Sequence, residues 1–429
     1  MSTVRIIRTF YIIYSLYTLF VILVSDYNFW YAFVGVGMIW LIYLVFLAGY
    51  SSVRQSIESS KSENNEKQQN YPLSNISNWK RITYLVHSIL VFICSFAAAK
   101  FYTGRNPGEI ILGAIHMSNS YAIYQKYAKM ANIGVFTIYK IPYVLMLMYC
   151  FTMLLWGSVG ILLSEEKKNV FQYIFVASSM AALLLFGVAR GTNYEMYIVF
   201  VTLVYCILNK KRKQNHIFSE KWKKYLIVGI IGVVVILVFK IVVEARGYVF
   251  RNQICEEINY DPNKSFSKLF PTITNIGLSF FRYLGWGIFS IGIITDTVVF
   301  GSLSSFISSL LPFGYTLIQG ETLDSIVRQT ISVGTGWVPD YFAFIDGFGW
   351  IFFIVLIFVA GKVMGALEKG AYPRLLKSLM GVLIFLEMLS IPVGNFIIVS
   401  TPLLLSVLYI AFWFVLHKLP ISFVVRKRI

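Results

Sequence analysis

Residues 170–208 read VFQYIFVASSMAALLLFGVARGTNYEMYIVFVTLVYCIL, two apolar runs (170–189 and 195–208) joined by the polar turn ARGTNYE. A run of about 20 apolar residues is long enough to cross a hydrocarbon core about 30 Å thick. The core contains no water, so every backbone N–H and C=O must pair within its own segment, as in a helix. This stretch therefore predicts two membrane-spanning helices.

The same pattern recurs along the whole chain. Hydrophobic residues make up 57% of the 429 positions and charged residues only 13%, with a mean hydropathy of +0.70. Soluble proteins carry about 25% charged residues. We expect ten spans, at 9–25, 28–50, 82–99, 141–163, 170–189, 195–208, 225–243, 344–362, 377–393 and 398–416. The predicted fold is a single all-α, polytopic integral membrane domain over residues 1–429.

Basic residues indicate the orientation of this domain, because cytoplasmic segments are enriched in Lys and Arg. With the N-terminus inside, most of the 37 basic residues fall in the inward segments, so both termini are predicted to be cytoplasmic. Residues 51–80 are polar and are expected to form a flexible cytoplasmic loop. The net charge of +17 then reflects topology and contact with anionic lipids, and no nucleic acid is expected as a partner.

Two outward segments, 100–140 and 244–343, are too long to be simple connections. The second contains apolar stretches at 272–300 and 306–318. These form either interfacial or re-entrant helices, which we favour, or a further pair of spans. The total is thus about 10–12 transmembrane helices, with a large outward-facing loop.

Common catalytic motifs are missing from the sequence. It contains no GxxxxGK[ST], HExxH, CxxC or GxSxG pattern, and so nothing that predicts ATP binding, a metal site or a serine hydrolase. What remains is a set of arginines beside apolar segments: Arg190 in ARGTNYE, Arg246 and Arg251 in EARGYVFR, and Arg282 in FRYLGWG. A charge in such a place is costly and therefore suggests a function.

These arginines also have simpler interpretations. Arg190 could reach lipid phosphate, and Arg282 could pair with Asp296. Several outward guanidinium groups around an apolar cleft nevertheless suit a phosphate, because each offers a rigid fork of hydrogen-bond donors. A lipid pyrophosphate would place its tail between helices and its diphosphate on the arginines.

Two carboxylates stand at the mouth of a late span, Asp340 and Asp346 in the sequence GTGWVPDYFAFIDGFGW (334–350). Each is either a hydrogen-bonding group at the helix mouth or a catalytic or binding group. In the first outer segment, the sequence around Arg105, TGRNPGE, has the composition of a turn.

Three of these segments give the chain a resemblance to a known family. GTGWVPDYFAFIDGFGW, ARGTNYE and TGRNPGEIILGAI (103–115), together with the large outer loop, resemble bacterial O-antigen and capsule repeat-unit polymerases of the Wzy type. The resemblance implies a GT-C-like glycosyltransferase in the bacterial cytoplasmic membrane. Its substrates would be undecaprenyl-pyrophosphate-linked oligosaccharides, and a chain-length regulator protein would be a further partner.

The resemblance also implies roles for particular residues. Arg190, Arg246 and Arg282 would grip the pyrophosphate, and three further residues would contribute to substrate binding, namely Arg251, Tyr194 and Arg105. A carboxylate should accept the proton of the acceptor hydroxyl, with Asp340, Asp346 and Glu257 as candidates in that order. No metal or other cofactor is implied, because arginines can neutralise the charge of the leaving group.

Two other functions fit the same architecture. One is an O-antigen ligase of similar fold, and the other is a flippase or transporter of lipid-linked oligosaccharides. A flippase should carry charge around a cavity in the middle of the membrane and have short outer loops. The gathering of charge at the outer mouth, around a long loop, favours an enzyme.

Overall fold

The computed structural model describes residues 3–53, 81–115, 120–133, 135, 137–164, 168–209, 229, 261, 263–280, 286–330, 339–369, 374–394 and 400–418. Within these ranges every element of regular secondary structure is a helix. The predicted all-α class is therefore confirmed for this part of the chain.

Seven helical segments of the described chain are long and apolar enough to cross a membrane. They are α1 (Thr3–Val24), α2 (Phe29–Ser51), α4 (Arg81–Thr103), the succession η2, α7, η3 and α8 (Ile138–Leu163), α9 (Val170–Arg190), the Phe344–Lys369 part of α18 (Asp340–Lys369), and the Leu376–Val393 part of α19 (Arg374–Val393). Two shorter apolar helices are α10 (Tyr194–Asn209) and α20 (Thr401–Lys418).

These helices confirm a polytopic helical membrane protein. Each predicted span that falls within the described residues coincides with one of them, whereas the span expected at 225–243 lies outside the described residues. The number of 10–12 spans and the GT-C-like arrangement remain predictions.

The apolar stretch expected at 272–318 forms a sharply bent element. Here α14 (Trp286–Ile294) and η5 (Thr295–Phe300) run together and then turn by 112° into α15 (Leu303–Leu310). Such a bend is typical of a broken span or a re-entrant loop. Other described parts of the outer segments form short helices: α5 (Pro107–Ile115), α6 (Ser120–Met130), α12 (Ser265–Leu269), α13 (Pro271–Phe280), α16 (Gly314–Gln319) and α17 (Leu323–Thr330).

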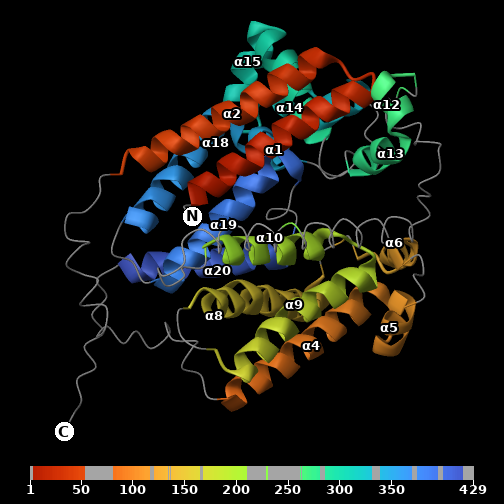
Figure 1. Cartoon of the computed structure of the whole chain (residues 1–429), viewed down its shortest axis with the longest axis vertical. Coiled ribbons are helices and arrows are strands. Elements are labelled where there is room, and N and C mark those ends of the chain that lie inside the picture. Colours follow the sequence, from red (N-terminus) through yellow and green to blue (C-terminus); the bar gives the residue numbers. More distant parts are fainter. Residues whose placement is uncertain are drawn as a thin grey trace.

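The long helices form two groups with α19 and α20 between them (Figure 1). In one group α2 packs against α1, α14 and α18, and in the other α4 and α9 pack against each other and against α7. Helix α19 contacts members of both groups, among them α1, α18, α8 and α10, and its apolar window is the most buried of the seven. The two groups therefore share one core through α19.

Glycines allow α2 to lie close to two of its neighbours. A Cβ atom at Gly35 would lie 2.0 Å from the carbonyl oxygen of Ile288 in α14, and one at Gly49 would lie 2.0 Å from that of Phe358 in α18. Both distances are far below van der Waals contact, so a side chain is excluded at either position. Close approach of backbones at small residues is a usual source of helix packing energy in membranes.

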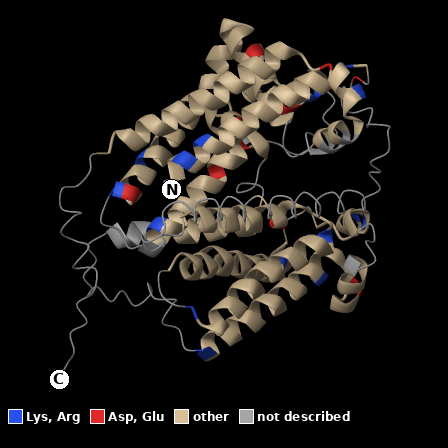
Figure 2. Cartoon of the chain, in the orientation of Figure 1, with Lys and Arg blue, Asp and Glu red and all other residues tan. Residues whose placement is uncertain are grey.

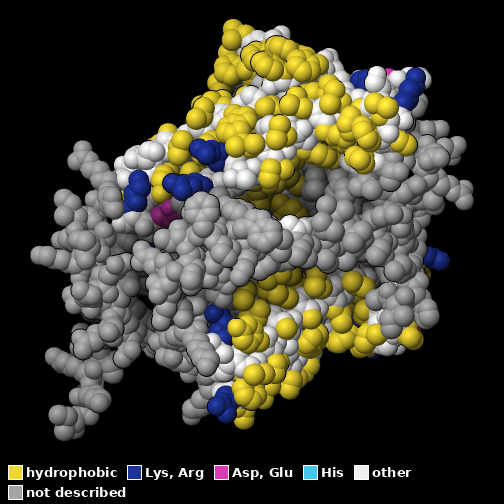
Figure 3. Space-filling model, viewed as in Figure 1, with side chains coloured by type: hydrophobic (Ala, Val, Ile, Leu, Met, Phe, Trp, Pro, Cys, Tyr) yellow, Lys and Arg dark blue, Asp and Glu magenta, His cyan; other side chains and the backbone are white. Residues whose placement is uncertain are grey.

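The outer faces of both groups expose large apolar side chains, as hydrocarbon requires (Figure 3). Charged residues lie mainly towards the ends of the helices (Figure 2). At one end, here called the Glu368 end, Glu368 accepts hydrogen bonds from the Thr3 N–H and the Tyr50 hydroxyl, and Lys369 binds the carbonyl of Val53. The opposite end, called the Arg190 end, carries α5, α6 and the turn between α9 and α10 (Figure 1). Of the described residues, the ends of α2 and α18 near residues 51 and 369 thus lie at one end, and the α9–α10 turn lies at the other, whereas the predicted orientation in the membrane remains a prediction.

Candidate functional site

The turn that joins α9 to α10 is built by two glycines. Gly191 adopts a left-handed conformation (φ 65°), and the N–H groups of Thr192 and Gly191 donate to the carbonyls of Gly187 and Val188. This is the Schellman arrangement, which glycine permits because it lacks a Cβ. A Cβ at Gly187 would lie 3.0 Å from Oε2 of Glu195, so this glycine lets the Glu195 side chain fold back over the end of α9.

Arg190 lies under this turn and forms an ion pair with Glu195. The hydroxyl of Thr192 donates to the second oxygen of the same carboxylate at 2.8 Å. Glu195 is 1% exposed, whereas the Arg190 side chain is 19% exposed. The pairing explains how a carboxylate can be buried here, since an unpaired charge would be strongly disfavoured.

Aromatic rings hold the guanidinium group of Arg190 from other directions. Its central carbon lies 4.4 Å from the ring centroid of Phe186 and 5.7 Å from that of Tyr124, both within cation–π range. Its Nε atom is buried and has no hydrogen-bond partner among the described residues. Arg190 is therefore fixed in place, with one donor unused and part of the side chain still open. The simpler interpretation, an arginine that only reaches lipid phosphate, does not describe this arrangement.

Arg105 lies near the same turn. As expected from its sequence, it follows a turn at Gly104 (φ 70°), and its Nη1 atom donates to the hydroxyl of Ser120 at 3.1 Å. Ser120 begins α6, and a Cβ at Gly191 would lie 2.5 Å from the backbone nitrogen of the next residue, Tyr121. The start of α6 thus contacts both Arg105 and the turn that carries Arg190.

Tyr194 connects this turn with the interior. Its side chain lies near Ser400, just before α20, and within electrostatic range of Arg190, Glu195 and Asp340. Asp340 is completely buried at the start of α18 and also interacts electrostatically with Tyr197, one turn along α10. Arg190, Tyr194 and Asp340, three of the residues that the sequence singled out, therefore lie in one region of the fold.

The start of α14 and the end of α19 meet beside Asp340. A Cβ at Gly287, in the first turn of α14, would lie 1.8 Å from the carbonyl oxygen of Pro392 and 3.1 Å from the ring of Pro339, the neighbour of Asp340. The hydroxyl of Tyr14 in α1 donates to the same Pro392 carbonyl at 3.0 Å. We refer to Arg190, Tyr194, Glu195, Tyr197 and Asp340 as the polar cluster.

Asp346 does not share these contacts, although only six residues separate it from Asp340. Its Oδ1 atom accepts a hydrogen bond from the backbone N–H of Leu323 at 3.3 Å, at the first residue of α17. Asp346 thus binds the end of a short helix.

The remaining predicted site residues, Arg246, Arg251, Glu257 and Arg282, lie outside the described residues. Asp296, considered as a partner for Arg282, accepts a hydrogen bond from the Trp30 indole at 2.7 Å.

Sequence reasoning missed three features of the polar cluster and its surroundings. It did not identify Glu195 as the partner of Arg190, although both stand in the quoted ARGTNYE motif. The roles of Tyr124 and Tyr197 were also missed. The spacing of Tyr194 and Tyr197, three residues apart on a helix and therefore on one face, was the available signal for Tyr197.

Among the described residues, no three His, Cys, Asp or Glu side chains are grouped so that they could hold a metal ion. In comparisons with known proteins, no family model, no curated protein and no solved structure matches this chain.

Proposed function

We propose that the protein is a polysaccharide polymerase, which joins undecaprenyl-pyrophosphate-linked oligosaccharide repeat units on the outer face of the bacterial cytoplasmic membrane. The proposal combines the sequence resemblance with one structural observation. A buried carboxylate, Asp340, and a partly open guanidinium group, Arg190, both lie within electrostatic range of Tyr194 in a helical bundle that has the composition of a membrane protein. An enzyme that releases a pyrophosphate needs a base and a cation in such proximity.

In the proposed reaction, a hydroxyl of one lipid-linked repeat unit attacks the anomeric carbon of the growing glycan. The bond between that carbon and the pyrophosphate oxygen breaks, and polyprenyl pyrophosphate leaves with the bonding electrons. Asp340 accepts the hydroxyl proton, as a positioned general base. Arg190, with Arg246 and Arg282 from the outer loop, stabilises the negative charge that develops on the leaving group.

Glu195 and the rings around Arg190 support this role by fixing the guanidinium. A cation that is already oriented does not have to be reorganised when charge develops, and preorganisation is the main source of electrostatic catalysis. The open part of the Arg190 side chain is available to phosphate oxygens. In this proposal Tyr194 contacts the glycan beside the base and the cation.

A gel of surface polysaccharide tests the proposal. A bacterial strain that lacks the protein should transfer single repeat units and form no long ladder, and Arg190→Ala should behave in the same way when the ladders are compared per amount of folded protein. Arg328→Ala is a matched control, because Arg328 is 47% exposed and pairs with Asp324 on the surface of α17. A full ladder from Arg190→Ala would remove Arg190 from the mechanism. Loss of all transferred repeats in the deletion strain would point to the ligase or flippase.

A further inference from the structure

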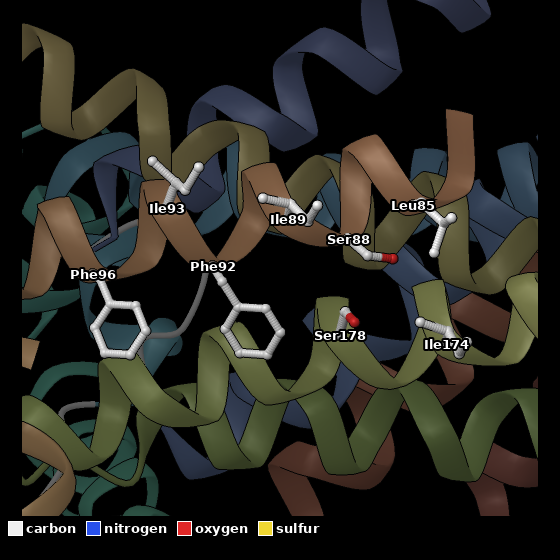
Figure 4. Close-up of a pocket in the computed structure, with 8 residues that line it drawn as sticks. All are labelled: Leu85, Ser88, Ile89, Phe92, Ile93, Phe96, Ile174 and Ser178. Atoms are coloured by element: carbon white, nitrogen blue, oxygen red, sulfur yellow. The ribbon is translucent and has the colours of Figure 1, made fainter. Parts of the chain in front are cut away.

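An apolar groove lies between α4 and α9, outside the polar cluster (Figure 4). Its volume is about 600 Å³. Six of its eight lining residues belong to α4 and two to α9: Leu85, Ser88, Ile89, Phe92, Ile93, Phe96, Ile174 and Ser178. In the close-up, the rings of Phe92 and Phe96 point from α4 towards α9. The groove is open to the side, where Ile89 and Ile93 are more than half exposed.

The depth of this groove limits what can fill it from the Arg190 end. Along α4 the lining residues run from Leu85 to Phe96, which is about 16 Å at 1.5 Å per residue. Phe96 lies about 10 Å below Thr103, the last residue of α4. The groove therefore extends from about 10 to about 27 Å below this end, whereas one leaflet of hydrocarbon is only about 15 Å thick. A phospholipid anchored at the Arg190 end would reach only the upper part.

A closed apolar cluster separates the upper end of the groove from Arg190 and contacts both. Above Phe96, α4 and α9 close together in an apolar cluster that contains Ala98, Ala99 and Phe186, with Tyr102 packed against it. The centroid of the Tyr102 ring lies 5.8 Å from that of the Phe186 ring. The central carbon of the Arg190 guanidinium lies 4.4 Å from the same Phe186 centroid. A headgroup at Arg190 and a chain in the groove would thus follow the same pair of helices.

We propose that the α4–α9 groove binds the isoprenoid chain of the lipid-linked glycan, with the pyrophosphate at Arg190 and the chain extending past the bilayer midplane. This inference rests on the proposed function and assigns a chain-binding surface to it. A polyisoprenoid suits the groove because its chain is longer than one leaflet and its methyl branches can pack against Phe92 and Phe96. Ser88 costs little in this apolar setting, since its hydroxyl already donates to the carbonyl of Tyr84.

Photochemical cross-linking tests this inference without requiring activity. The purified full-length protein, in nanodiscs of phosphatidylethanolamine and phosphatidylglycerol, is irradiated with undecaprenyl phosphate that carries a photoreactive group near the end of its chain. We expect cross-links in peptides that contain residues 85–96 and 174–178, and we expect them to persist in the presence of excess phospholipid. Cross-links that excess phospholipid abolishes, or that are spread evenly over all lipid-facing helices, would show that the groove takes ordinary lipid chains and would overturn the proposal.

A filled groove gives a second test. Ile93→Trp should place a large ring in the groove, and Leu16→Trp on α1, where Leu16 is equally exposed to lipid, is the matched control. We expect Ile93→Trp to lower cross-linking, and to raise KM about tenfold for undecaprenyl-linked but not for farnesyl-linked repeat units, as expected from the loss of about two buried methylene groups. Equal effects on both chain lengths, or none, would overturn the groove assignment. Wild-type protein that cross-links in the groove but polymerises neither substrate would instead contradict the proposed function alone.

Discussion

Breaking the Arg190–Glu195 ion pair should destabilise the protein by far more than an ordinary surface pair does. Removing one partner of a buried pair costs about 3–5 kcal/mol, because the other charge stays buried and unpaired. Arg190 is 19% exposed and can recover some hydration, so we expect about 2–3 kcal/mol for Glu195→Ala. Arg190→Ala should cost at least as much, since it leaves the buried carboxylate with only the Thr192 hydroxyl.

A double-mutant cycle measures this interaction directly. Unfolding of Arg190→Ala, Glu195→Ala and the double variant in mixed micelles, followed by tryptophan fluorescence, should give a coupling free energy of about 2–3 kcal/mol. The exposed pair Arg328–Asp324 is a suitable reference, for which we expect about 0.3–0.5 kcal/mol. A coupling at Arg190–Glu195 no larger than the reference value would refute the conclusion that this pair holds the turn between α9 and α10 in place.

Three further predictions concern other positions. Gly35→Leu should lower the unfolding free energy by about 1–3 kcal/mol or prevent folding, because the new Cβ would overlap the Ile288 carbonyl. Unchanged stability in micelles would contradict the close packing of α2 against α14. Asp346→Ala should keep most of the polysaccharide ladder and cost about 1 kcal/mol of stability, because it removes the acceptor of the Leu323 N–H. Loss of the ladder at normal abundance would instead assign Asp346 a catalytic role. Glu387→Gln should leave the unfolding free energy within about 1 kcal/mol of wild type, because the buried Oε1 atom has no hydrogen-bond partner among the described residues. A larger decrease in the unfolding free energy would contradict this and indicate a partner outside them.

The spans could be predicted from sequence because each depends on a local property. The boundary between residues 189 and 195 was located almost to the residue, since an apolar run, a glycine and a second apolar run follow one another there. Length and hydropathy decide such helices before any tertiary contact forms. The bend between η5 and α15 was harder to predict from sequence, because the same apolar composition is compatible with a straight span.

The polar cluster could be predicted only in part, because its contacts join distant segments. Arg190 and Asp340 stood out as costly charges beside apolar helices, but their shared neighbour Tyr194 was visible only as part of a motif. Asp340 and Asp346 looked equivalent in sequence, and the folded chain separates them, because one lies among the ends of the long helices and the other binds α17. Spacing along one helix does not specify which of the surrounding elements a side chain meets.

The most direct test of the account is polymerisation by the purified protein. Nanodiscs that contain the protein and undecaprenyl-pyrophosphate-linked single repeat units, with no nucleotide sugar or added metal, should yield lipid-linked glycans of two and more repeats. One undecaprenyl pyrophosphate should be released for each bond formed, and Asp340→Asn should abolish both products. Substrate that stays as single repeats with the folded wild-type protein, or full activity of Asp340→Asn, would contradict it.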